Sequence, residues 1–91
     1  MTFDKLLSPI KIRELELKNR IIMTGMGTKM NDQSAVTDML VKYHAARAAG
    51  GVALNTLEVC SVDAASAPKN FVSIAEDRLM PGHKKFTDAI H

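Results

Sequence analysis

Residues 17–28 constrain the fold of this chain more than any other part of the sequence. Three polar residues at 18–20 precede a continuous apolar run at 21–23, and a segment rich in small residues follows at 24–27. A short, uninterrupted apolar run is typical of a parallel strand that is covered on both faces. Glycines after such a strand let another molecule approach the backbone closely. Because ligands of α/β proteins bind at the carboxyl ends of parallel strands, this pattern predicts a site at the end of the run.

The residues before this run predict a β-hairpin. Apolar side chains alternate with polar ones on both sides of Arg13 and Glu14, a pattern formed by Ile10, Ile12, Leu15 and Leu17. Alternation of this kind favours two short strands joined by a turn. We expect the hairpin to cap the bottom of the sheet before the first parallel strand begins.

A helix is predicted to follow the first strand, after a polar, turn-like segment at 31–35. Thr37 is a good N-cap, and Asp38 stands near the positive end of the helix dipole. The two glycines at 50–51 predict a left-handed C-terminal stop. The helix face expected to pack on the sheet consists of residues at helical spacing with Leu40 beside them, namely Met39, Tyr43, Ala46 and Gly50.

Residues 52–59 predict a second strand, and residues 63–73 predict a loop. Three side chains make this strand unusually polar, and such groups need partners when they are buried: Asn55, Thr56 and Glu58. Pro81 fits the first turn of a second helix, where its missing N–H does no harm. The packing face of that helix is predicted to consist of Phe86, Ala89 and Ile90.

Composition excludes several classes of protein. The 91 residues carry 12 basic and 10 acidic side chains, scattered along the chain, which does not indicate a nucleic-acid surface. No 18-residue apolar stretch predicts a membrane span, and the start of the chain lacks the apolar core of a signal peptide. The single cysteine, Cys60, cannot form an internal disulfide. We therefore expect a cytoplasmic protein that binds neither nucleic acid nor membranes.

The histidines and Cys60 do not predict a metal site. His44, His83 and His91 have no metal-ligand spacing with one another or with neighbouring acids, and the two histidines inside the predicted helices are expected to be ordinary. A lone cysteine is usually a small buried apolar residue. No Ser-His-Asp or Cys-His arrangement predicts a nucleophile either.

The order of several sequence blocks resembles the old yellow enzyme family of FMN-dependent oxidoreductases. Met23, Met26 and Thr28 are most similar to the larger branch of 2,4-dienoyl-CoA reductases, enoate reductases and NADH oxidases. The blocks follow one another at family spacing over nearly the whole chain, at 7–12, 15–28, 43–52, 57–59, 77–82 and 86–91. The resemblance implies an α/β fold that is the N-terminal portion of a (β/α)8 TIM barrel. A complete barrel takes about 250 residues, so we expect residues 1–91 to form the hairpin and about two βα units of a flavin-binding domain truncated at its C-terminus.

The resemblance also implies which residues contact the cofactor. In the family, the loop after the first strand supplies backbone contacts to the flavin ring, which assigns that role to Thr24, Gly25, Met26 and Gly27. The alternative to flavin contact is a tight turn between strand and loop, in which the glycines are needed only for the conformation of the turn. Gly25 departs from a frequent family proline, and Gly27 replaces a Thr or Cys that can tune the flavin. Val59 is implied to contact the pyrimidine side of the flavin through its backbone, and Glu58 is expected to be a structural anchor.

The implied activity is transfer of hydride from a nicotinamide nucleotide to FMN and then to an activated C=C bond of an unsaturated carbonyl or enoyl substrate. The catalytic and phosphate-binding residues are expected beyond His91, as are the ligands of any 4Fe-4S cluster or FAD in a full-length protein. By itself the 91-residue chain is expected to be inactive. The alternative is a non-catalytic remnant that associates with itself or with a separately encoded rest of the barrel through its open strand edges.

Overall fold

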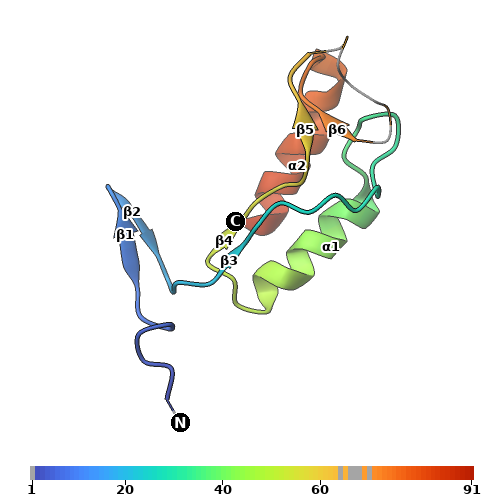
Figure 1. Cartoon of the computed structure of the whole chain (residues 1–91). Helices are drawn as coiled ribbons and strands as arrows, with labels where there is room; N and C mark the ends of the chain where they lie inside the picture. Colours follow the sequence, from blue (N-terminus) through green and yellow to red (C-terminus); the bar gives the residue numbers. More distant parts are fainter. Residues whose placement is uncertain (1, 64, 66–68, 70) are drawn as a thin grey trace.

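A computed structural model describes residues 2–63, 65, 69 and 71–91 of the chain. In chain order the elements are a hairpin, a parallel strand pair with a helix between its strands, a second short parallel pair, and a final helix (Figure 1). Their bounds are β1 Ile10–Ile12, β2 Leu15–Leu17, β3 Ile22–Met23, α1 Asp38–Ala49, β4 Leu54–Asn55, β5 Cys60–Ser61, β6 Val72–Ser73, η2 Asp77–Leu79 and α2 Met80–Ile90.

The predicted hairpin is confirmed. β1 and β2 pair antiparallel, with Ile10 opposite Leu17, and Arg13 in the turn adopts a left-handed φ of 53°. Leu17 is buried where the hairpin meets the rest of the molecule, whereas Ile12 and Leu15 are more than half exposed. Figure 1 shows the hairpin to one side of the helices, with β2 on the side of the β3–β4 pair.

The two predicted parallel strands are also present, but they are shorter than expected. β3 and β4 pair in parallel, with Met23 opposite Asn55. Backbone hydrogen bonds extend the pairing by one step on each side, from Ala53 N to Ile21 O at 3.0 Å and from Thr56 N to Met23 O at 3.0 Å. Regular pairing ends there, so the predicted strand at 52–59 is wrong at both ends.

Helix α1 begins where the sequence predicted. Thr37 accepts a hydrogen bond from Leu40 N, and Asp38 lies in the first turn. At the other end Gly51 has a φ of +119°, which L side chains rarely adopt, while Gly50 keeps a right-handed φ of −73°. The stop therefore depends on Gly51 alone.

The face of α1 that packs on the strands is not the predicted one. The residues buried on α1 are Leu40, Val41 and His44, whereas Met39 is 64% exposed and Ala46 and Gly50 are exposed as well. Met39 was expected to be buried because it shares helical spacing with Tyr43. The true face is shifted by about one residue, and it includes a histidine that an apolar pattern does not count.

Helix α2 packs beside α1 and begins with Pro81 in its first turn, as predicted. Phe86 is buried, but Ala89 is exposed and Ile90 is only partly buried, so the predicted packing face is right at one position. A Cβ at Gly82 would lie 3.2 Å from the Cβ and carbonyl oxygen of Val36, which shows how closely α2 approaches the segment before α1.

The predicted loop at 63–73 contains a strand at its end. β6 pairs in parallel with β5, with Cys60 opposite Val72, and both residues of β6 are buried. Positions 64, 66–68 and 70 of the predicted loop lie outside the described residues. A small turn formed by residues 32–35 lies against this region, because Ser73 N donates to Ser34 O at 3.0 Å and Ser34 N donates to Lys69 O at 3.1 Å.

Together these elements form a small α/β unit in which the described residues do not close a barrel. Apart from the short β5–β6 pair and the 3-10 turn η2, the order hairpin, strand, helix, strand, helix matches the start of a (β/α)8 barrel, so the predicted fold class is confirmed. No helix among the described residues is both long enough and apolar enough to cross a membrane.

Candidate functional site

The loops that follow β3 and β4 meet at one end of the parallel pair. Because the strands are parallel, both loops leave from the same edge of the sheet. A Cβ at Gly25 would lie 3.3 Å from the carbonyl oxygen of Leu57 and 3.9 Å from the Cα of Glu58. Position 25 therefore requires a residue without a large side chain, since the second segment passes directly beside it.

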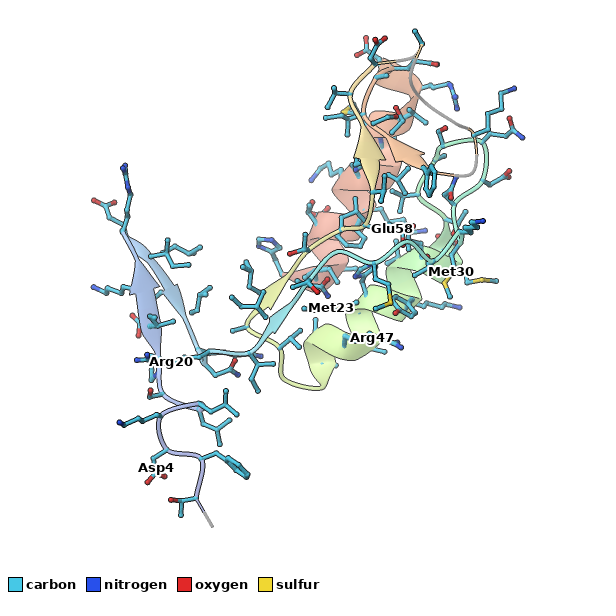
Figure 2. The ribbon with its side chains drawn as sticks, viewed as in Figure 1. Asp4, Arg20, Met23, Met30, Arg47 and Glu58 are labelled. Atoms are coloured by element: carbon cyan, nitrogen blue, oxygen red, sulfur yellow. The ribbon has the colours of Figure 1, made fainter. Side chains whose placement is uncertain are left out.

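A buried carboxylate joins the two loops. Glu58 is only 5% exposed, and its Oε2 accepts a hydrogen bond from Thr28 N at 2.8 Å. Figure 2 shows Glu58 beside the segment that leads from Met23 to Met30. A buried carboxylate that binds a backbone N–H holds that backbone in place. This contact supports the expectation that Glu58 is a structural anchor.

The residues predicted to contact a cofactor are accessible at this edge. Thr24, Gly25, Met26 and Gly27 are all exposed, and Val59 is 56% exposed. Among the described residues, a Cβ at Gly27 would come within 4 Å of the ring of Phe71 alone, at 3.8 Å, so a side chain could be added there without a clash. The structure thus brings the two predicted segments together at an exposed edge.

The segment between this loop and α1 is held by further hydrogen bonds. Thr28 Oγ1 accepts a bond from Met30 N at 3.3 Å, and Thr37 Oγ1 donates to the carbonyl oxygen of Met30. Lys29, between the first two, has a left-handed φ of 59°. A non-glycine residue keeps this conformation only where its surroundings determine it strongly.

Sequence reasoning missed a polar pair that joins α1 to β4. His44 in α1 is 1% exposed, and its Nδ1 donates to Asn55 Oδ1 at 2.7 Å, while Asn55 Nδ2 donates to the carbonyl oxygen of His44 at 3.2 Å. The ring of His44 also makes an edge contact with Phe86, with centroids 5.0 Å apart. The polarity of the second strand was the available signal. It indicated that Asn55 needs a partner but not that a helix histidine supplies it.

His83 and Cys60, which the sequence did not assign to a site, have structural surroundings. His83 Nε2 donates to the carbonyl oxygen of Ser73 at 2.8 Å, so this histidine does reach a strand end and fixes α2 to β6. Cys60 is partly buried in β5, and desolvation raises the pKa of its thiol above the ordinary value. Among the described residues, no three His, Cys, Asp or Glu side chains are placed to hold a metal ion.

Comparison with known protein families identifies the family to which the chain is related. Residues 5–91 match the model of the NADH:flavin oxidoreductase / NADH oxidase family. The chain belongs to this family. The predicted resemblance is thereby confirmed over nearly the full length of the sequence.

Curated relatives match almost the whole chain but are much longer than it. A metal reductase of Desulforamulus reducens is 35% identical over 93% of this chain and 13% of its own length. An NADH oxidase of Thermoanaerobacter brockii is 36% identical over 98% of this chain and 14% of its own length. The chain thus spans about one seventh of these two relatives.

A solved structure shows the same backbone arrangement. The structure of a 2-naphthoyl-CoA reductase in complex with 2-naphthoyl-CoA superposes on 98% of this chain with a TM-score of 0.92 and 26% identity, and the match covers 14% of that chain. The hairpin and the two βα units therefore have the same arrangement as the corresponding part of this much longer reductase.

The residues at this edge fit the ring end of FMN. A planar ring can approach the backbone closely where a residue has no side chain, and Gly25 and Gly27 provide two such exposed positions in the loop after β3. The open position at Gly27 is consistent with this fit, because the nearest described atom to a Cβ there belongs to a side chain 3.8 Å away.

Proposed function

We propose that these residues form the flavin-contacting start of an FMN-dependent NAD(P)H oxidoreductase that reduces activated C=C bonds. One observation carries the proposal: the exposed residues 24–27 lie at the carboxyl edge of a parallel pair, together with the exposed Val59 and the buried carboxylate of Glu58. In this proposal Thr24, Gly25, Met26 and Gly27 contact the flavin ring, and Val59 contacts its pyrimidine side.

The contribution of this chain would be to bind and orient the ring. Bound FMN would supply the hydride chemistry between a nicotinamide nucleotide and the unsaturated carbonyl or enoyl substrate. In a (β/α)8 barrel the phosphate end of such a ligand is usually held by loops after the seventh and eighth strands, which follow these two units in the fold. A 4Fe-4S cluster and FAD, if a full-length protein contains them, would likewise be held outside residues 1–91.

A variant at Gly27 tests this proposal. In a protein that carries these residues with the rest of the barrel, Gly27→Val should lower FMN occupancy, measured as flavin absorbance per polypeptide. Ala49→Val is the matched control, because it adds bulk at an exposed position of α1. Occupancy that is equal in wild type and Gly27→Val would leave only the tight-turn interpretation of the loop.

A second candidate function is a non-catalytic remnant that associates with itself or with a separate rest of the barrel. The observation that favours it is the amount of apolar surface near the strand ends, including Ile22, Val59, Val62 and Ile74, each at least 47% exposed. In both candidates the 91-residue chain alone would bind FMN weakly and would not reduce a C=C bond, so the test of the remnant is association. Size-exclusion chromatography should show concentration-dependent oligomers of the 91-residue chain, and a chain that stays monomeric at all concentrations would contradict self-association.

A further inference from the structure

A continuous chain of hydrogen bonds follows the loop at 24–27. It starts at Glu58 Oε2, which accepts from Thr28 N, and continues from Thr28 Oγ1, which accepts from Met30 N. The carbonyl oxygen of Met30 then accepts from the hydroxyl of Thr37, and the oxygen of that hydroxyl accepts from Leu40 N at 3.2 Å. This series of hydrogen bonds therefore runs from the loop between β4 and β5 to the first turn of α1.

The residues at both ends of this series of hydrogen bonds are buried. Glu58 is 5% exposed, and Leu40 in the first turn of α1 is fully buried. Between these ends Lys29 holds a left-handed φ of 59°, a conformation that is uncommon for residues other than glycine. A segment that keeps such a residue between two anchored ends is determined by its contacts rather than by its own preference.

We propose that this chain of hydrogen bonds positions the loop at 24–27 for FMN, with Glu58 and Thr37 as positioning residues at its two ends. This inference rests on the proposed function, since it concerns how the flavin-facing loop is held. It goes beyond that function because neither Glu58 nor Thr37 would touch the flavin. A loop that is already ordered loses less conformational entropy when a ligand binds, so loss of either end should weaken binding.

Thr37 allows a test that separates the loop from the helix. Its hydroxyl caps α1 by accepting from Leu40 N and also donates to Met30 O. An ionised aspartate can accept the first bond but cannot donate the second, whereas serine can do both. Thr37→Asp should therefore keep the helix and release the loop, and Thr37→Ser should behave like wild type.

The expected result is a loss of FMN affinity without a loss of fold. In the FMN-binding protein, Thr37→Asp should raise the Kd for FMN up to about tenfold, the upper bound set by one lost hydrogen bond, with the helix content unchanged. Fluorescence quenching of FMN measures the Kd, and circular dichroism follows the helix. An unchanged Kd in Thr37→Asp would overturn the proposal.

The other end is tested at Glu58 by a readout that needs no flavin. Glu58→Gln retains an oxygen that can accept from Thr28 N, whereas Glu58→Val does not. Amide hydrogen exchange at Thr28 and Met30, measured by NMR, should be as slow in Glu58→Gln as in wild type and at least tenfold faster in Glu58→Val. Equal exchange in Glu58→Val and wild type would contradict the inference.

These outcomes distinguish the inference from the proposed function. A wild-type protein that binds no FMN in any form would overturn the proposed function, and the inference would lose its ligand with it. FMN binding that stays equal in wild type, Thr37→Asp and Glu58→Val would overturn the inference alone. Weaker binding in Thr37→Asp and Glu58→Val, with recovery in Thr37→Ser and Glu58→Gln, would support both.

Discussion

The helix-facing side of the β3–β4 pair and its carboxyl edge are built in different ways. On the helix side, Leu40 and Phe86 are buried and His44 is joined to Asn55 by two hydrogen bonds. At the carboxyl edge, Val59 and the loop at 24–27 are exposed, and polar contacts to the backbone hold the loop from behind. The helix-facing side is a packed core. The carboxyl edge is an exposed surface, held by hydrogen bonds, that we propose contacts FMN.

This difference shows how stability and binding are divided in the molecule. Burial of apolar side chains stabilises the helix side, because each removes area from water. The carboxyl edge buries little apolar area and depends on hydrogen bonds such as the one from Thr28 N to Glu58. Changes on the helix side should therefore act mainly on stability, and changes at the edge mainly on FMN binding.

The largest expected effect is a core substitution on the helix side. Leu40→Ala should lower the free energy of unfolding by about 3 kcal/mol, because Leu40 is fully buried and its removal leaves a cavity. Met39→Ala, at a neighbouring position that is 64% exposed, is the matched control and should cost well under 1 kcal/mol. Urea denaturation measures both, and equal losses would erase the distinction between core and surface on α1.

The next effect concerns the polar pair in the same core. Asn55→Ala should lower the free energy of unfolding by about 2 kcal/mol, because it leaves His44 Nδ1 buried without its acceptor. The double variant with His44→Ala should cost less than the sum of the two single variants, since the partners are removed together. Additive losses in this cycle would show that the pair does not join α1 to β4.

The two glycines of the loop should differ in how much stability is lost when each is replaced by alanine. Gly25→Ala should cost about 1 kcal/mol of stability, because its Cβ would lie 3.3 Å from the carbonyl oxygen of Leu57. Gly27→Ala should leave stability nearly unchanged, since its Cβ would make an ordinary contact with Phe71 at 3.8 Å. Urea denaturation of the two variants side by side is the measurement, and a larger loss at Gly27 than at Gly25 would contradict the described approach of the strand ends.

The smallest expected effect is a pH dependence on the outer surface. Hydrogen bonding and charge from Lys85 lower the pKa of Asp38, so this pair contributes stability above the ordinary pKa of 3.8 and loses it as the pH falls through the lower folded value. Wild type should therefore exceed Lys85→Met slightly in urea midpoint at neutral pH, and the difference should vanish in acid. Lys18→Met, on the hairpin, is the control. A difference that grows in acid would contradict the sign of the pKa shift.

The sequence predicted the order of the elements because local signals placed them. Thr37 and Asp38 marked the start of α1, Pro81 marked the first turn of α2, and the apolar run at 21–23 marked β3. It did not predict β6, because Val72 and Ser73 are too few to form a pattern and are paired only with a distant segment. Strand ends were also wrong, since they depend on where the neighbouring strand turns away.

At the candidate site the sequence predicted the participants but not the contacts. Gly25, Gly27 and Glu58 could be singled out by residue type and by their places near the ends of two predicted strands. The bond from Thr28 N to Glu58 spans 30 positions, and no local pattern predicts it. Likewise His44 was expected to be ordinary, because nothing in the spacing of the sequence connects it to Asn55.

An NMR titration with FMN tests the central claim most directly. Backbone amide shifts of the purified protein are followed while FMN is added to a large excess, so that weak binding is also detected. The account predicts the largest shifts at Thr24, Gly25, Met26, Gly27 and Val59, and little change at Leu40 and His44 in the core. Shifts concentrated away from the carboxyl edge, or no shifts at saturating FMN, would contradict it.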